Sequence, residues 1–345
     1  MASKQQAAGQ PNKRPVISTV DPPAAITGGE LYIRGEHLAS GGRPTVRLGT
    51  QNAQLMVSGD SYIIARVPEA ALVGEVVVTS GGVESGLRET HIGIQIADSL
   101  HPVANPAVDA EGNVYSTFSG SRGQKSPVSI YKIDTNYNSK PFVTDLMNPT
   151  GLAFDKDGLL YVSSRYDGIV YQITPTGNMT VFVEGMGVAT GLAFDSEGNL
   201  YVGDRSGTIF KISRSRQIYV FATLEPSIAA YHLAFGPEDY LYVTGPTTSS
   251  FDAIHRISKA GEVETFYRGL GRPQGLAFDA AGRLYAAASL QGRRGIVRFD
   301  NSHEPQQFLS GPGVVGLAFT PSKSIVLATH SALFRVDIDI AGRRL

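Results

Sequence analysis

The chain has 345 residues, no cysteine and a formal net charge of −1. The absence of cysteine excludes disulfides, thiol chemistry and cysteine-ligated metal sites. A near-neutral charge provides no overall field that would attract nucleic acid or an anionic membrane. The 39 glycines and 19 prolines favour tight turns over long helices, and no apolar run reaches the roughly 18 residues of a spanning helix. This composition is typical of an all-β protein.

Residues 1–13 are small and polar, and we expect a disordered tail because they offer little apolar surface to bury. The segment has basic residues but no apolar run after them, so it does not resemble a signal peptide. As written, the sequence predicts a cytoplasmic protein. A periplasmic or extracellular location requires that a leader has been removed.

Short alternating segments, separated by turn signals such as Asp21-Pro22-Pro23, occupy residues 14–96. About seven short strands in this stretch predict a β-sandwich. The period-2 alternation places Leu31 and Ile33, and likewise Val76 and Val78, on a core-facing side.

Several motifs in the same stretch follow a family pattern. They are PVISTVDPPAAITGGELYIRGEHL, VRLGTQNAQ, IIARVPEA and GEVVVTSGG. This segment resembles an IPT/TIG immunoglobulin-like domain. The resemblance implies a sandwich that serves as a spacer or docking module. Some domains of this type bind DNA, but no basic cluster supports that role here.

A motif of the form GLAFD-x-x-G-x-LYV recurs six times, beginning near Asn105, Thr150, Thr190, Tyr231, Gln274 and Val315. The residue after the apolar triplet recurs at spacings of 46, 40, 41, 43 and 41. A period near 40 with four short strands in each unit indicates propeller blades. We predict a six-bladed β-propeller of four-stranded blades over residues 97–345.

The last repeat lacks a fourth strand, because the chain ends soon after ALFRVD. The segment HIGIQIAD, which precedes the first repeat, resembles the fourth strand of the other repeats. We expect residues near 91–97 to pair beside ALFRVDI and close the ring, which removes an exposed sheet edge. The alternative assigns these residues to the last strand of the sandwich. Both assignments hold if one long strand bridges the two domains.

As a set, the repeats are similar to those of the NHL and senescence-marker/gluconolactonase propellers. The resemblance implies the architecture but little of the chemistry, because propellers carry unrelated functions. Lactonases of this group hold a divalent cation with a Glu, an Asp and Asn residues, one Asn directly before the motif glycine. Here only Asn105 supplies that asparagine, and Asp204 is a further carboxylate. The expected ligand set is incomplete, so we expect no metal; the alternative is a site built on Asn105 and Asp204.

An acidic residue recurs at the end of the apolar triplet, at Asp109, Asp155, Asp195 and Asp279. Each stands directly before a turn of the D-x-x-G type or a related one. Because short acidic side chains bond the backbone of their own turn, we interpret these residues as turn-forming rather than metal-binding.

Two histidines, His232 and His330, fall where this type of propeller places the loops of its channel face. His232 interrupts the motif GLAF as HLAF. Histidine acts as a general acid or base, so His232, His330 and Asp204 are the catalytic candidates. The alternative is a channel-lining histidine bonded to a neighbour. Streptogramin lyases are propellers that use such a histidine, but this chain has no Trp and therefore lacks their repeat pattern.

Basic and aromatic residues occur in the loops that this blade order places on one face. The ligand-binding candidates are Arg122, Arg165, Tyr166, Arg205, Tyr231, His232, Arg272, Arg293 and Arg294. Arginine presents forked donors that match carboxylate or phosphate. The alternative is that these arginines are ordinary solvated charges.

We therefore expect a non-catalytic binding or scaffolding propeller that recognises a protein or a small anionic molecule through its channel face, without a cofactor. RNA-binding NHL propellers use a similar face, but the near-neutral charge does not favour a nucleic-acid partner, and no membrane partner is expected. The alternative is a metal-dependent sugar-lactone hydrolase that uses a divalent cation such as Ca²⁺.

Overall fold

The regular elements of this computed structural model are β-strands, apart from one short 3₁₀ turn, Pro237–Asp239, among the residues described. The structure describes residues 13–121, 123–248, 252–300 and 302–343. The predicted tail therefore lies outside the described residues except for Lys13. The chain divides into two units, one ending at Ile92 and the other beginning at Gly93. No helix in the described ranges is long and apolar enough to cross a membrane.

The first unit is a sandwich of two antiparallel sheets. One has the order β1 (Val16–Asp21), β3 (Glu30–Glu36), β7 (Tyr62–Arg66) and β6 (Gln54–Ser58). The other has the order β10 (Arg88–Glu89), β8 (Glu75–Ser80), β4 (Thr45–Leu48) and β5 (Gln51–Asn52), with β9 (Val83–Glu84) also paired to β8. A short parallel pair joins β2 (Ala24–Ala25) and β11 (His91–Ile92). The predicted core-facing residues Leu31, Ile33, Val76 and Val78 are all buried.

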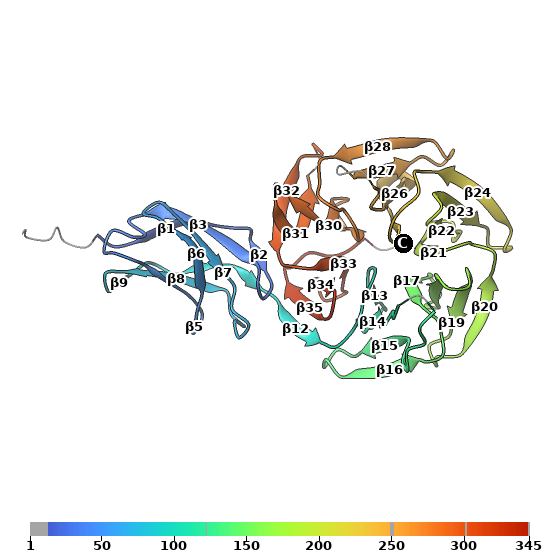
Figure 1. Cartoon of the computed structure of the whole chain (residues 1–345), viewed down its shortest axis with the longest axis horizontal. Helices are drawn as coiled ribbons and strands as arrows, with labels where there is room; N and C mark the ends of the chain where they lie inside the picture. Colours follow the sequence, from blue (N-terminus) through green and yellow to red (C-terminus); the bar gives the residue numbers. More distant parts are fainter. Residues whose placement is uncertain (1–12, 122, 249–251, 301, 344–345) are drawn as a thin grey trace, which may run out of the picture. The chain divides into compact units, whose positions relative to one another are not determined.

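The second unit is a ring of six blades, each built from four strands of this unit, counted over the described residues (Figure 1). Blade one contains β13 (Ala107–Val108), β14 (Val114–Thr117), β15 (Ile130–Ile133) and β16 (Ser139–Val143). Blade two contains β17 (Pro149–Phe154), β18 (Leu160–Ser164), β19 (Val170–Ile173) and β20 (Met179–Val183). Blade three contains β21 (Ala189–Phe194), β22 (Leu200–Asp204), β23 (Thr208–Ile212) and β24 (Ile218–Thr223).

Blades four to six follow the same order from the inner to the outer strand. Blade four contains β25 (His232–Phe235), β26 (Leu241–Thr244), β27 (Ala253–Ile257) and β28 (Val263–Arg268). Blade five contains β29 (Leu276–Phe278), β30 (Leu284–Leu290), β31 (Arg293–Phe299) and β32 (Pro305–Ser310). Blade six contains β33 (Val314–Phe319), β34 (Ser324–Thr329), β35 (Leu333–Asp337) and, as its outer strand, β12 (Ile94–Ala97).

The strand β12 precedes blade one in the chain but pairs antiparallel with the last strand, β35. Its register sets Ile94 opposite Arg335 and Ala97 opposite Leu333. The segment 91–97 is thus divided at Gly93, with β11 in the first unit and β12 in the second. This pairing joins the two ends of the propeller chain in one blade.

The repeated motif also explains how neighbouring blades pack. The ring of Tyr201, from the second strand of blade three, makes edge contacts with Phe221 of the same blade and Phe235 of the next, each at 4.9 Å between centroids. The motif glycine of blade three, Gly191, lies where a Cβ would come within 2.5 Å of the Tyr231 carbonyl oxygen. The inner strands of blades three and four therefore approach too closely for a side chain at Gly191. His232 occupies the equivalent position in blade four.

Candidate functional site

The repeated aspartates build turns, as the sequence predicts. The Asp195 carboxylate accepts hydrogen bonds from the backbone N–H groups of Glu197 (3.0 Å) and Asn199 (2.8 Å) and from the Tyr201 hydroxyl (3.2 Å). Asp155 and Asp279 accept the corresponding backbone bonds. Burial raises the pKa of the Tyr201 hydroxyl, and the Asp195 charge raises it further. These carboxylates are used by the scaffold, and function has to be sought where the blades differ.

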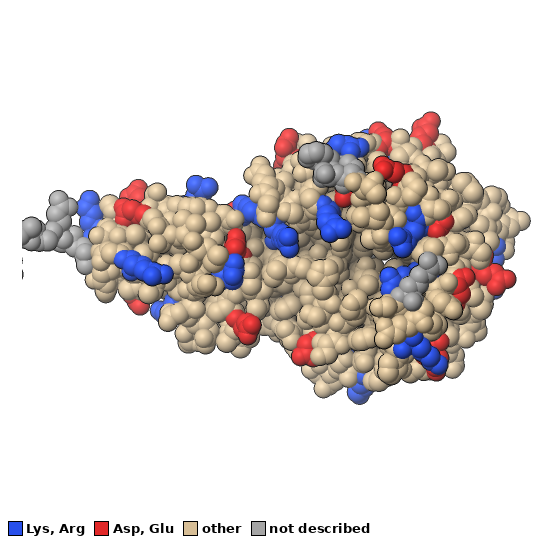
Figure 2. Space-filling view, in the orientation of Figure 1, with Lys and Arg blue, Asp and Glu red and all other residues tan. Residues whose placement is uncertain are grey.

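The candidate site is the channel face, which we define as the face formed by the loops before each first strand and after each second strand. Antiparallel blades place both sets of loops on the same side. Figure 2 shows Lys and Arg side chains dispersed among uncharged residues rather than joined in one patch on the visible face. The role of each predicted residue therefore depends on its own contacts.

Asn105 connects three blades. Its amide nitrogen donates to the Leu276 carbonyl oxygen (2.8 Å), and its amide oxygen accepts from the Leu317 N–H (3.1 Å). Asp204 is buried at the end of β22, where its carboxylate accepts from the Val188 N–H (2.8 Å) and from the Ser206 hydroxyl. Both candidate metal ligands therefore hold backbone or hydroxyl partners already.

The donor set does not fit a divalent cation. Such ions require several oxygen ligands, usually including carboxylates. Among the described residues, no group of three or more His, Cys, Asp or Glu side chains is placed to hold a metal ion. We derive no chemical step through a metal.

His232 lies at the inner strand of blade four and is only 4% exposed. Its imidazole makes no side-chain hydrogen bond within the part of the chain that the structure describes. Burial lowers the pKa of His232 from 6.5 to about 4. At neutral pH the ring is therefore uncharged, and a histidine without an orienting carboxylate is poorly equipped for proton transfer.

The burial of His232 predicts a loss of stability in acid. The unfolded chain takes up the proton near pH 6.5 and the folded chain only near pH 4, so stability falls as the pH drops through this interval. At about pH 5 we expect this histidine alone to lower the free energy of unfolding by about 2 kcal/mol relative to neutral pH. Urea denaturation of the wild type and of His232→Gln at both pH values measures this difference. An equal acid response of the two proteins would contradict the prediction.

Tyr231, the residue before His232, is also buried. Its hydroxyl donates to the Glu225 carbonyl oxygen, and its backbone N–H donates to Thr190 Oγ1 (3.1 Å). Burial raises the pKa of Tyr231 to about 12. The ring is thus a packing element of the channel wall. Tyr166, which follows β18 in blade two, is by contrast exposed.

Two of the candidate arginines bind neighbouring loops. Arg165 Nη2 donates to the Gly120 carbonyl oxygen of blade one (2.7 Å). Arg205 donates to the carbonyl oxygens of Ser227 (3.4 Å) and Ile228 (2.9 Å), in the loop that leads into blade four. These side chains fasten adjacent blades on the channel face.

The remaining described arginines of the set belong to blade five: Arg272 lies in the loop before β29, and Arg293 and Arg294 begin β31. Gly271 of that loop forms a bridge with Ser289 of β30, and sequence alone offers no signal for that pairing. The structure therefore brings these three arginines into one blade. Arg122 lies outside the described residues. His330 is exposed in the turn after β34, where its ring lies against Gly313.

One feature on the opposite face was absent from the sequence predictions. A cavity of about 340 Å³ lies at the junction of blades four and five, among the turns between first and second strands and between third and fourth strands. The available signal was the turn Gly236-Pro237-Glu238-Asp239-Tyr240, which replaces the repeat's aspartate and glycine.

Comparison with known proteins agrees with the two-part architecture. Residues 15–91 match the IPT/TIG domain family. No curated protein matches the chain. The propeller is similar to a solved structure of a protein proposed to be a gluconolactonase, with 16% identity, a TM-score of 0.61, and coverage of 74% of this chain and 94% of that one.

Two further solved structures resemble nearly the whole chain. An auxiliary nutrient binding protein from Bacteroides thetaiotaomicron has 12% identity and a TM-score of 0.53, with 95% of this chain and 99% of that chain covered. A virginiamycin B lyase from Staphylococcus aureus has 14% identity and a TM-score of 0.51, with 95% and 96% covered. At such identities the likeness concerns the fold alone. The chain thus combines a segment that matches the IPT/TIG domain family with a six-bladed β-propeller, and its fold is similar to those of the three solved structures named above.

Proposed function

We propose that the propeller is a binding module that captures a small anionic molecule, a carboxylate or a phosphate, at blade five of its channel face. The observation that carries the proposal is a pair of exposed arginines: Arg272 lies in the loop before β29, and Arg294 lies at the start of β31, in the hairpin to which that loop is bonded. Gly271 and Ser289 exchange two backbone hydrogen bonds, of 2.8 and 2.9 Å, between the loop and the hairpin.

The hairpin that carries Arg294 is longer than its counterpart in blade three and closes through a tight turn. Strands β30 and β31 have seven residues each, whereas β22 and β23 of blade three have five. The hairpin closes through Gln291 (φ 52°) and Gly292 (φ 83°), a two-residue turn whose twist suits the flanking strands. Side chains on a rigid hairpin lose less entropy on binding than those on a mobile loop.

Neither Arg272 nor Arg294 forms an ion pair or a side-chain hydrogen bond with any residue that the structure describes. Other basic side chains of the propeller are already paired with carboxylates; examples are Lys125–Asp145, Lys259–Asp239 and Arg283–Asp279. The two arginines therefore offer forked donors and uncompensated charge for an anion.

Calorimetric titration with inorganic phosphate and with citrate tests the proposal. We expect the double variant Arg272→Glu/Arg294→Glu to bind at least tenfold more weakly than the wild type, because two charge-assisted contacts become repulsive. Raised salt should weaken wild-type binding. Arg214→Glu, an exposed arginine on the opposite face, is the matched control and should bind like the wild type.

Two results would contradict this function. One is unchanged binding by the double variant. The other is hydrolysis of a sugar lactone that EDTA abolishes and Asp204→Asn impairs, which would favour the metal-dependent hydrolase instead. The hydrolase alternative rests on likeness of fold, and no observation at the channel face favours it.

A further inference from the structure

We propose that a second ligand site, for a neutral sugar ring, lies at the junction of blades four and five on the face opposite the channel face. The site is the cavity of about 340 Å³ described above. This volume lies at the lower end of the range for ligand pockets, roughly 300–1,000 Å³, and suits one or two sugar rings. The site is separate from the arginines of the proposed anion site and does not depend on them.

The cavity is associated with a local departure of blade four from the repeat. In blades one, three and five, a tyrosine hydroxyl donates to the repeat aspartate; the pairs are Tyr115–Asp109, Tyr201–Asp195 and Tyr285–Asp279. In blade four the aspartate is replaced by Gly236, so the equivalent Tyr242 has no such carboxylate beside it. A Cβ at Gly236 would meet the rings of Tyr242 (2.6 Å) and Phe278 (2.7 Å).

The turn after Gly236 is held in an unfavourable conformation. Glu238 and Asp239 both adopt positive φ angles, of 60° and 57°, in the left-handed region that favours glycine. Asp239 is fixed by Lys259, at 2.8 Å. Glu238 is exposed and forms no ion pair within the described ranges. Backbone strain of this kind is concentrated at ligand sites, where other interactions maintain it.

Aromatic rings form the floor and walls of the cavity. Tyr242 packs edge-on against Phe266 (5.1 Å) and Phe278 (4.9 Å), and Phe266 packs in the same way against Phe299 (5.4 Å) and His303 (4.8 Å). Tyr242, Phe278 and Phe299 are buried, whereas Phe266 is partly exposed. Phe266 is therefore the ring of this group whose open side can receive the C–H face of a sugar.

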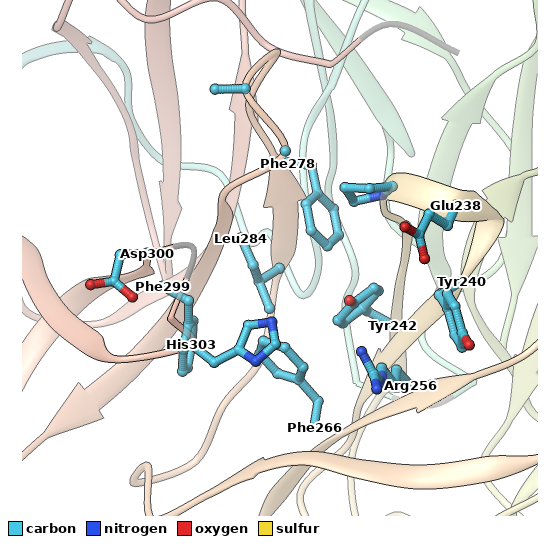
Figure 3. A pocket seen from close by; sticks show the side chains of 13 residues that line it. Glu238, Tyr240, Tyr242, Arg256, Phe266, Phe278, Leu284, Phe299, Asp300 and His303 are labelled. Atoms are coloured by element: carbon cyan, nitrogen blue, oxygen red, sulfur yellow. The ribbon is translucent and has the colours of Figure 1, made fainter.

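The polar groups at the rim include both donors and acceptors. Figure 3 shows Glu238, Tyr240 and Arg256 on one side of the open space and Asp300 and His303 on the other. The hydroxyl groups of a sugar both donate and accept hydrogen bonds, so a sugar ring can use the donors and the acceptors of this rim. An anion would use only the rim's donors, and an organic cation only its acceptors.

The charge of the rim also disfavours an anion. The Arg256 guanidinium is paired with Glu264 and lies over the Tyr240 ring at 5.1 Å. Backbone and side-chain hydrogen bonds from Ser302, and a backbone bond from Glu304, hold the pKa of Asp300 below its usual value, so this carboxylate stays ionised. The rim therefore offers fixed acceptors beside a neutralised arginine, and a neutral ligand matches it best.

Saturation-transfer NMR on the full chain tests the site. Glucose, galactose, mannose, N-acetylglucosamine and maltose are the probes, with choline and inorganic phosphate as representatives of the other two charge classes. Irradiation of the aromatic protons should transfer saturation to the ring protons of at least one sugar. Ala281→Trp, which places a large ring at the wall of the cavity, should abolish this transfer. Glu238→Ala should weaken binding about tenfold, because it removes a charged acceptor.

The matched control is Glu197→Trp. Glu197 is the second residue after the repeat aspartate in blade three, as Ala281 is in blade five, and each backbone N–H donates to that aspartate. This variant should retain sugar binding. The proposal is overturned if no sugar receives saturation, if Ala281→Trp binds like the wild type, or if choline or phosphate occupies the cavity in preference to every sugar. The Arg272→Glu/Arg294→Glu variant should bind the sugar normally, so the two sites are tested independently.

Discussion

Replacement of Asp279 by alanine is expected to lower the free energy of unfolding by roughly 3 kcal/mol. The Asp279 carboxylate is 1% exposed and accepts from the N–H groups of Ala281 (3.0 Å) and Arg283 (2.9 Å) and from the Tyr285 hydroxyl (3.1 Å). The substitution leaves these donors without their acceptor in a buried turn between β29 and β30. It also removes the ion pair with Arg283 (2.6 Å), whose partly exposed side chain can be rehydrated.

Urea denaturation followed by tyrosine fluorescence measures this loss, because the chain has 15 tyrosines and no tryptophan. Asp134→Ala is the matched control. Asp134 caps a turn of the same kind, through Asn136 and Asn138, but its carboxylate is exposed to water. We expect a much smaller effect there. Equal losses for the two variants would show that burial does not determine the role of the repeat aspartate.

Replacement of Ile96 by aspartate is expected to destabilise the propeller by about 4 kcal/mol or to prevent its folding. Ile96 is buried in a cluster with Leu100, Val114, Val326 and Leu333, where an ionised carboxylate would have no partner. Because β12 is the outer strand of blade six, its loss would expose the edge of β35 and separate the two ends of the ring.

Gln95→Asp is the control for this prediction. Gln95 is the preceding residue on β12, and its side chain is exposed on the other side of the strand. Its replacement should leave the unfolding midpoint nearly unchanged. A similar midpoint for Ile96→Asp and Gln95→Asp would mean that β12 does not contribute to closure of the propeller.

Much of the architecture follows from local patterns in the sequence. The five spacings between the six GLAF motifs reflect blades that each fold from about 40 consecutive residues, so their apolar periodicity is readable without tertiary information. The turn-forming role of Asp195 is equally local, because its partners are two to six residues away. The buried alternation of Leu31 and Ile33 is another such pattern.

The candidate site was less predictable, because its properties depend on contacts between distant segments. Arg165 and Arg272 look alike in sequence, yet Arg165 is held by the Gly120 carbonyl oxygen, 45 residues away, whereas Arg272 is exposed. Asn105 resembles a metal ligand, but its amide bonds lie 171 and 212 residues away in the chain. The sequence shows which polar side chains the loops contain. It does not show which of them form hydrogen bonds within the protein and which remain able to bind a ligand.

Local patterns are enough to predict the sandwich, the number of blades and the turn chemistry, because hydrophobic periodicity and Asp–Gly turns act within a few residues. The burial of His232 and the exposure of Arg272 and Arg294 depend instead on the packing of the folded chain. The cavity beside Tyr242 also depends on tertiary packing, because residues of blades four and five line it together. The reason is physical: burial and hydrogen-bond satisfaction are set by whichever segments meet at the blade junctions, and those segments are far apart along the chain.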